Sequence, residues 1–235
     1  MSIEENVKNI KAQMRQAAVA AGRDPDSVLL CAATKMNDAD AVRRAIGAGV
    51  DCCGENRVQE LTEKLAQNAY EGAPVHFIGH LQTNKVKFVV GKVDLIQSVD
   101  SLRLLEAIQK QAEKLAIVQD ILLEVNIALQ ESKSGFTREE LPEILEAAST
   151  FPNIRVRGFM AIPPIADNPT DNHKFFQEMC NLSVDITTKK GDNVCVDVLS
   201  MGMSDDYADA IACGSTMVRV GTAIFGRRNY VTTHS

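Results

Sequence analysis

Apolar residues recur along this chain in two patterns: helical spacing, and short continuous runs typical of strands buried on both faces. The first pattern opens the chain, where residues 2–21 carry apolar side chains at helical spacing before Gly22. This spacing predicts an N-terminal helix that ends at the glycine. Eight apolar runs follow, and we interpret each as a strand. These runs cover residues 28–34, 51–54, 75–79, 94–98, 119–127, 154–161, 194–199 and 216–220.

Segments with helical periodicity lie between successive runs. Asp38 precedes the helix predicted over 39–48, where its carboxylate can accept hydrogen bonds from the first free N–H groups. The other helices are predicted over residues 56–69, 83–90, 101–115, 137–149, 170–189 and 205–213, with a short turn over 222–226. Strand and helix therefore alternate through almost the whole chain.

Eight β/α units in 235 residues predict an α/β fold, a single (β/α)8 TIM barrel with an additional N-terminal helix. We expect one domain over residues 1–235, because no linker or repeat divides the sequence. An open doubly wound sheet is the alternative. That fold carries a Gly-x-Gly-x-x-Gly turn after its first strand, whereas this chain reads Thr34-Lys35-Met36-Asn37 there.

The composition narrows the functional classes. A formal net charge of −6 gives no basic footprint for nucleic acid or for anionic lipid. No segment reaches the apolar length that crosses a bilayer, and residues 1–6 contain no apolar secretory core. We therefore expect a cytosolic (cytoplasmic) protein.

Six cysteines invite a disulfide or metal interpretation; their positions are 31, 52, 53, 180, 195 and 213. No Cys-x-x-Cys pair occurs, and Cys52 and Cys53 would point to opposite faces of one strand. Cys31 and Cys195 lie inside apolar runs, where reduced cysteine behaves as a small apolar residue. The spacing therefore predicts buried thiols at these two positions and no metal site.

The residues suited to chemistry lie at the predicted carboxyl ends of strands, which form the functional face of such a barrel. Lys35 ends the first strand, and a partly desolvated lysine is a good nucleophile. The loops after the seventh and eighth strands read Ser200-Met-Gly-Met-Ser-Asp-Asp206 and Gly221-Thr-Ala-Ile-Phe-Gly226. Their hydroxyls, glycines and backbone N–H groups are typical of a phosphate site. An amine beside an anion site suits an aldehyde that carries a phosphate, which indicates pyridoxal 5′-phosphate (PLP), a form of vitamin B6.

Several longer motifs give the chain a family resemblance. They read Thr34-Lys35, Gly54-Glu-Asn56, His76-Phe-Ile-Gly79-His80-Leu-Gln-Thr-Asn84-Lys85, Ser134-Gly135, Gly158-Phe-Met-Ala-Ile-Pro163, Ser200-Met-Gly-Met-Ser-Asp-Asp206 and Val218-Arg-Val-Gly-Thr-Ala-Ile-Phe-Gly226. With these motifs in order, the chain resembles the PLP homeostasis proteins, also called PLP-binding proteins. The resemblance implies a barrel similar to the N-terminal domain of alanine racemase and a role in intracellular PLP homeostasis.

The resemblance also implies roles for individual residues. Lys35 matches the lysine that holds PLP as a Schiff base, Arg219 the arginine near the pyridine nitrogen, and Asn56 a polar pocket residue. The phosphate would be bound by Ser200, the backbone at Met201, Gly221 and Thr222. His80 receives no catalytic role.

Arg219 carries a chemical argument of its own. A permanently charged guanidinium cannot hand a proton to the ring nitrogen, which leaves PLP a weaker electron sink. The alternative role for Arg219 is an ion pair with Asp205 or Asp206.

Three functions fit these residues. We favour a protein that binds and buffers PLP without turnover, with transient contacts to PLP-dependent apo-enzymes. The second is an amino-acid racemase, which needs a base on each face of the substrate, and Tyr207 is the candidate for the second base. The third is a lyase in which Lys35 attacks a sugar phosphate without a cofactor, for which the sequence offers no acid–base relay. Because the second domain of racemases has no counterpart here, we expect a monomer.

Overall fold

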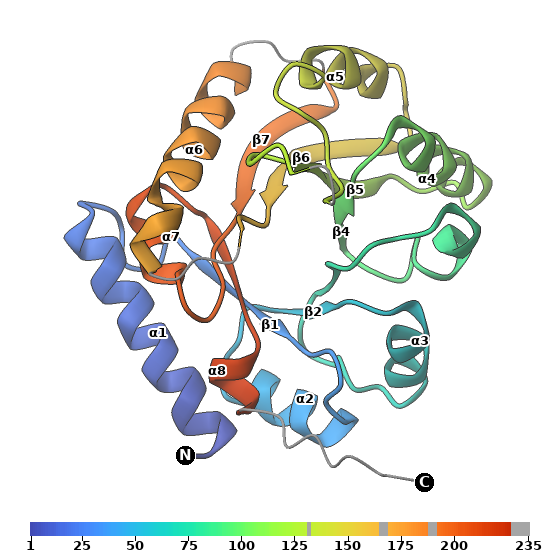
Figure 1. Ribbon diagram of the computed structural model, residues 1–235. Helices are drawn as coiled ribbons and strands as arrows, with labels where there is room; N and C mark the ends of the chain where they lie inside the picture. Colours follow the sequence, from blue (N-terminus) through green and yellow to red (C-terminus); the bar gives the residue numbers. More distant parts are fainter. Residues whose placement is uncertain (131–132, 165–168, 188–191, 227–235) are drawn as a thin grey trace, which may run out of the picture.

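The structure is a computed structural model that describes residues 1–130, 133–164, 169–187 and 192–226. Eight strands close into a barrel in chain order, and helices surround it (Figure 1). The strands are β1 (Leu29–Ala33), β2 (Cys52–Glu55), β3 (Val75–Phe77), β4 (Leu95–Val99), β5 (Gln119–Val125), β6 (Ile154–Ala161), β7 (Val194–Ser200) and β8 (Met217–Val220). Each of the eight apolar runs is a strand, so the predicted barrel is confirmed.

The helices lie largely at their predicted positions. They are α1 (Ile3–Ala20), α2 (Ala39–Gly47), α3 (Val58–Ala66), the 3₁₀ helix η1 (Thr83–Phe88), α4 (Leu102–Lys114), α5 (Leu141–Ser149), the 3₁₀ helix η2 (Pro169–Asn172), α6 (His173–Thr187), α7 (Tyr207–Ala212) and α8 (Thr222–Phe225). Asp38 caps α2 as predicted, because its Oδ1 accepts a hydrogen bond from the Ala41 N–H at 2.8 Å. The predicted end of the helix over 170–189 lies outside the described residues.

One helix differs in type from the prediction. The segment expected as an α-helix over 83–90 is the 3₁₀ helix η1, in which Val86 is the buried side chain. Val89 and Val90 of the predicted segment are also buried, but they follow the end of η1, and a helix of this length commonly takes 3₁₀ geometry.

The strand register brings the beginning and the end of the chain together. β1 pairs in parallel with β8, with Ala32 opposite Val220, and β7 pairs with β8, with Ser200 opposite Met217. The carboxyl ends of β7, β8, β1 and β2 therefore lie side by side on one face of the barrel.

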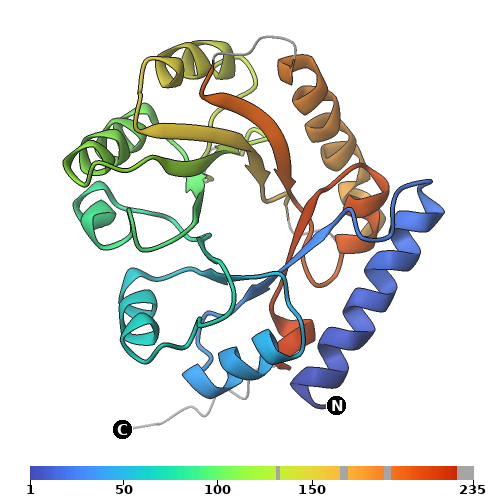
Figure 2. The ribbon, with the colours of Figure 1, turned by 180° about the vertical axis from the view of Figure 1, so that it is seen from behind.

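The added helix α1 packs outside the junction of β8 and β1. Ser2 and Glu5 form a capping box at its start, and its buried face includes Val7, Ile10 and Met14. This face lies against α2, α7 and α8, along one side of the barrel (Figure 2). α1 therefore covers the place where the sheet closes.

Apolar side chains fill the barrel from both sides of the sheet. Cys53 joins the large cluster between strands and helices, whereas Cys52 joins a small cluster with Cys31 and Met217. The opposite orientation predicted for the two neighbouring cysteines is thus confirmed. Cys195 is exposed, so the expectation of a buried thiol is wrong there, because side chains in the first half of β7 alternate between covered and open positions. Among the described residues, no helix has both the length and the apolarity to cross a bilayer.

Candidate functional site

The loop that carries Lys35 is fixed on both sides by hydrogen bonds. Lys35 follows β1 and is half-buried. Before it, the Thr34 N–H donates to the Gly54 carbonyl at 2.8 Å. After it, the Met36 N–H donates to Glu60 Oε2 at 2.5 Å, and Met36 has a left-handed φ of 60°. A non-glycine residue keeps this conformation only when its surroundings hold it, so the loop fixes the position of the lysine.

A buried ion pair lies beside this loop. The Lys64 ammonium contacts Glu55 Oε2 at 2.6 Å and donates to the Thr34 carbonyl at 2.8 Å. Lys64 is 5% exposed and Glu55 is fully buried, so neither charge is screened by water. The Tyr70 hydroxyl also donates to Glu55, at 3.3 Å, and burial, aided by the Glu55 charge, raises the pKa of Tyr70. The pair therefore ties the ends of β1 and β2 to α3.

The prediction from sequence missed this ion pair. The available signal was the position of Lys64 on the same face of its helix as the apolar Leu61, four residues after Glu60. A lysine in the apolar face of a helix needs a partner when it is buried.

A chain of hydrogen bonds crosses the inside of the barrel. Arg219 on β8 is 5% exposed; its Nη1 donates to Ser200 Oγ at 2.6 Å and its Nη2 to the Ala161 carbonyl at 2.9 Å. Ser200 Oγ donates to Gln97 Oε1 at 2.7 Å. Gln97 Nε2 contacts His76 Nδ1 at 2.9 Å. Residues of five strands, β3, β4, β6, β7 and β8, thus form one network that holds Arg219 and Ser200 in place.

The alternative predicted for Arg219, an ion pair with Asp205 or Asp206, does not occur among the described residues. Asp206 instead accepts hydrogen bonds from the Met203 N–H at 2.7 Å and from Asn172 Nδ2 at 2.9 Å. Burial lowers the pKa of the Arg219 guanidinium, an effect that the Asp206 charge opposes. The side chain is therefore bound by neutral oxygens.

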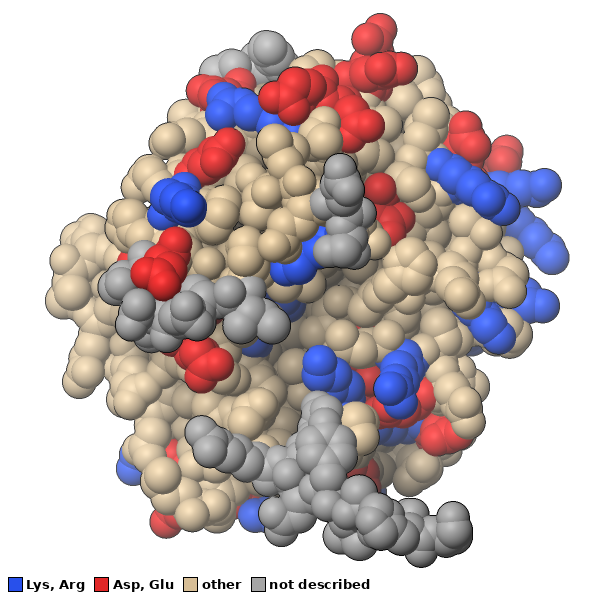
Figure 3. Space-filling view, in the orientation of Figure 1, with Lys and Arg blue, Asp and Glu red and all other residues tan. Residues whose placement is uncertain are grey.

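Glu124 on β5 adds a carboxyl group near the same face. Burial raises its pKa, and the charge of Asp100 raises it further. Arg219, His80 and Lys133 act in the opposite direction without cancelling the shift. Figure 3 shows Lys and Arg side chains reaching the surface near the middle of the face seen in Figure 1, although the chain as a whole is acidic.

The loop after β7 is tightly held. Met201 is fully buried, and its N–H donates to the Met217 carbonyl at 3.1 Å. Gly202 has a φ of 93°, and a Cβ at this position would lie 2.6 Å from Ala210 Cβ, so only glycine fits. Because the Met201 N–H and the Ser200 hydroxyl already have partners, a phosphate would have to share or replace these bonds.

The loop after β8 passes against the strand that leads to Lys35. A Cβ built on Gly221 would lie 3.4 Å from both the Cβ and the carbonyl oxygen of Ala33. Thr222 is exposed, and among the described residues nothing accepts a hydrogen bond from its backbone N–H. The next N–H, that of Ala223, donates to Ser204 Oγ at 3.4 Å and so joins the two loops. The structure therefore brings the strand end that carries Lys35 and the two predicted anion loops to one corner of the barrel.

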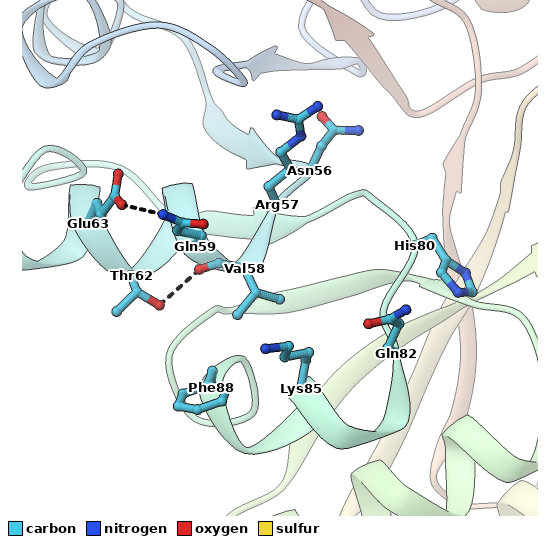
Figure 4. A pocket seen from close by; sticks show the side chains of 10 residues that line it. All are labelled: Asn56, Arg57, Val58, Gln59, Thr62, Glu63, His80, Gln82, Lys85 and Phe88. Atoms are coloured by element: carbon cyan, nitrogen blue, oxygen red, sulfur yellow. Dashed lines mark hydrogen bonds between the residues drawn. The ribbon is translucent and has the colours of Figure 1, made fainter.

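Asn56, at the end of β2, lines an adjoining cavity of about 720 Å³. Val58 faces Lys85 and Phe88 across this cavity, with His80 and Gln82 at one side (Figure 4). Asn56 Oδ1 is buried and has no hydrogen-bond partner among the described residues. Of the predicted binding residues, Asn56 alone is among those that line this cavity. The cavity therefore lies next to the predicted site and contains none of the other predicted binding residues.

His80 and Tyr207 have partners outside the predicted site. His80 is exposed, and its Nδ1 lies 3.0 Å from Asp100 Oδ2. Tyr207 is buried, and its hydroxyl donates to Gln13 Oε1 on α1, in the outer layer. Burial raises the pKa of Tyr207. Neither observation supports a catalytic role.

The donor set of this corner fits PLP. The groups that could complement a phosphorylated aldehyde are Arg219, Lys35, the Thr222 hydroxyl, and two polar groups to which the described part of the chain gives no partner. These two are Asn56 Oδ1 and the Thr222 N–H.

Comparison with known proteins agrees with this geometry. A sequence model of the alanine racemase N-terminal domain matches residues 2–229. The pyridoxal phosphate homeostasis protein of Aquifex aeolicus is 40% identical over 230 residues, which cover 98% of this chain and 100% of that protein. The chain belongs to this family.

A second curated relative and a solved structure are also similar to this chain. The protein of that name from Pseudomonas aeruginosa is 40% identical over 229 residues, which cover 97% of each chain. PipY of Synechococcus elongatus, solved with PLP bound, superposes with a TM-score of 0.83 at 30% identity and covers 96% of this chain and 100% of its own. The family resemblance seen in the motifs is thereby confirmed.

Proposed function

We propose that this protein binds PLP reversibly at the corner formed by the ends of β7, β8 and β1, and that it acts in intracellular PLP homeostasis. The names of the relatives and the PLP bound to PipY support the ligand. The observation that carries the proposal is the close approach of Gly221 to Ala33, two residues before Lys35. A Cβ built on Gly221 would lie only 3.4 Å from Ala33.

The residues have distinct parts in binding. PLP supplies an aldehyde that condenses reversibly with a primary amine, and Lys35 offers that amine. Gly221 and Thr222 offer an open backbone and a hydroxyl for phosphate oxygens, while Ser200 and Met201 fix the neighbouring loop. Asn56 Oδ1 offers an acceptor to a polar group of the ligand.

We infer that the protein has no catalytic turnover of its own. Arg219 is held by Ser200 and Ala161 and, as a permanent cation, supplies no proton to the ring nitrogen. Racemisation would need a second base near Lys35, and the Tyr207 hydroxyl is bonded to α1 instead. Binding and release of the cofactor therefore fit these side chains better than proton transfer.

Loss of Lys35 tests the ligand and the amine together. Wild-type protein incubated with PLP should become yellow, and borohydride should fix a PLP-sized mass on the peptide that contains Lys35. Lys35→Ala should show neither, because the neighbouring Lys64 ammonium is buried in its ion pair with Glu55 and does not replace the lost amine. Lys87→Ala, in an exposed lysine of η1, is the matched control and should behave as wild type.

Two outcomes would contradict the proposal. One is trapping of PLP on other lysines with Lys35 unmodified. The other is sustained conversion of L-alanine to D-alanine that Lys35→Ala abolishes, which would establish a racemase.

We also infer that the protein is a monomer and that it lies in the cytosol. We infer further that it transfers PLP to apo-enzymes by transient contact. All six cysteines are free thiols, as is typical of a reducing compartment. Sedimentation of the purified protein tests the monomer, and the rate at which an apo-enzyme gains activity from the loaded protein, compared with free PLP, tests transfer.

A further inference from the structure

Three side chains with metal-binding atoms lie together inside the barrel, and the proposed function uses none of them. They are Cys31 on β1, Cys52 on β2 and His76 on β3, and their ligand atoms all lie within 4.8 Å of one another. Their exposed fractions are 0%, 2% and 7%, so bulk water does not compete for these donors. The sequence spacing predicted no metal site, because the three residues are brought together only by strand pairing.

The strand register explains the cluster. Cys31 lies directly opposite Cys52 in the β1–β2 pair, and His76 lies opposite Gly54 in the β2–β3 pair. Cys52 and Gly54 are two residues apart and so point to the same face of the sheet. A Cβ at Gly54 would lie 2.9 Å from Cys31 Sγ, so the missing side chain leaves the room that the thiol occupies. Three adjacent strands thus present two thiols and an imidazole to one point.

The separations suit a shared ion. Two thiolates on a tetrahedral zinc ion lie about 3.8 Å apart, and a thiolate and an imidazole nitrogen about 3.6 Å apart, given bond lengths of about 2.3 and 2.05 Å. Donors already within 4.8 Å need shifts of about 1 Å or less to reach these values. Thiolate and imidazole ligands prefer Zn²⁺ and Cu⁺ over Mg²⁺ or Ca²⁺, which need oxygen ligands.

The surroundings of the cluster complete such a site. Gln97 Nε2 donates to His76 Nδ1 at 2.9 Å, which orients the ring and puts the proton of the neutral imidazole on Nε2. Metal binding through Nε2 therefore requires this proton to move to Nδ1 and the Gln97 amide to turn, so that its oxygen accepts from Nδ1–H. A metal-bound histidine usually donates its second ring N–H in this way. Met217 packs with both cysteines, and its thioether is a fourth donor that Cu⁺ accepts.

We propose that Cys31, Cys52 and His76 bind one thiophilic metal ion, Zn²⁺ or Cu⁺, inside the barrel. On binding, both thiols release their protons to solvent, and the two thiolates balance the charge of Zn²⁺ or leave a single negative charge with Cu⁺. Gln97 joins this cluster to Ser200 and Arg219, so the ion would lie one hydrogen-bonded side chain away from the proposed cofactor corner. Metal binding itself does not depend on the proposed function.

Metal titration of the full-length, reduced protein tests the proposal without PLP. Zn²⁺ is titrated against a chromophoric chelator, and Cu⁺, without oxygen, against bathocuproine disulfonate. Wild type should bind one equivalent of at least one of these ions. Cys31→Ala/Cys52→Ala should lose more than about 100-fold in affinity, since only one of the three ligands remains.

A second group of side chains with metal-binding atoms, which contains Cys213, supplies the matched control. The buried Cys213 Sγ, at the end of α7, lies 3.4 Å from Nδ1 of the exposed His173 on α6, next to Asp209. Cys213→Ala should leave the affinity unchanged. Loss of binding in Cys213→Ala, or equal affinity in the double variant and wild type, overturns the proposal, as does the absence of binding in wild type.

X-ray absorption of the loaded wild type keeps the proposal testable if the double variant does not fold. Two sulfur neighbours at about 2.3 Å and one nitrogen at about 2.0 Å are expected. A first shell made only of oxygen and nitrogen would overturn the assignment.

Discussion

Ser200 and Thr222 were both predicted to bind phosphate, yet their surroundings differ. Ser200 is buried and joins Gln97 to Arg219, whereas Thr222 is exposed. Ser200→Ala leaves the buried guanidinium one acceptor short and should lower the free energy of unfolding by about 2 kcal/mol, even without ligand. Thr222→Ala should change it by less than about 0.5 kcal/mol.

Both substitutions should weaken PLP binding. Thr222→Ala should do so by roughly 10-fold to 100-fold, for a lost hydrogen bond to a charged phosphate, and Ser200→Ala through the loosened loop. Urea unfolding and a PLP titration separate the two effects. Thr222→Ser keeps the hydroxyl and is the control for Thr222→Ala. Retention of wild-type affinity in Thr222→Ala would show that the phosphate lies elsewhere.

Glu124 makes the free energy of unfolding depend on pH. Burial raises the pKa of its carboxyl above the ordinary value of 4.5, so the folded protein holds this proton more tightly than the unfolded chain. The free energy of unfolding therefore decreases as the pH rises from about 4.5 through the raised pKa, and stays lower above it. Glu124→Gln should remove this decrease and stabilise the protein at neutral pH. Urea midpoints measured across this pH range check the sign, and a steeper decrease in the variant would contradict it.

At the scale of elements, the ion pair between Lys64 and Glu55 attaches helix α3 to the ends of β1 and β2. Lys64→Met would leave the Glu55 carboxylate buried without a cation and should lower the free energy of unfolding by about 3–5 kcal/mol. The double variant Lys64→Met/Glu55→Gln should recover part of this loss. Lys87→Met, on the exposed side of η1, should cost less than about 0.5 kcal/mol. Thermal and urea unfolding measure all three, and equal losses for Lys64→Met and Lys87→Met would contradict the prediction.

The same substitution has a second expected effect. The Lys64 ammonium donates to the Thr34 carbonyl, one residue before Lys35. Its loss should loosen the Lys35 loop and speed the release of bound PLP, which a chase with a PLP-consuming apo-enzyme measures. An unchanged release rate in a variant that remains folded would show that Glu60 and Gly54 suffice to hold the loop.

Elements were largely predictable from sequence because each strand has to be apolar on both faces and each surface helix on one. This rule found β1–β8, and turn and cap residues identified Asp38 as the start of α2 and Gly22 as the end of α1. The rule failed at Cys195, because the first half of β7 exposes alternate side chains. It also gave η1 the wrong helix type, since apolar spacing over so short a segment does not separate 3₁₀ from α geometry.

At the scale of the whole molecule, the corner around Lys35 could be located because carboxyl ends of parallel strands share one face. The hydrogen bonds inside the barrel could not be found in this way. Ser200 and Gln97 are 103 positions apart, and their contact depends on closure of the sheet. Cys31, Cys52 and His76 meet for the same reason. Motif spacing detects metal-binding side chains that lie on one helix, strand or loop. It does not detect those that only the pairing of distant strands brings together.

The junction of β1 and β8 has a consequence for how the protein is made. Lys35 is synthesised early, while Gly221 and Thr222 are among the last described residues, and they meet only across this junction. On the proposed binding mode, a growing chain therefore has no complete PLP site until β8 has left the ribosome. Once the barrel is closed, a ligand that contacts the ends of both β1 and β8 stabilises their pairing. Separation of β1 from β8 should therefore cost more free energy when PLP is bound.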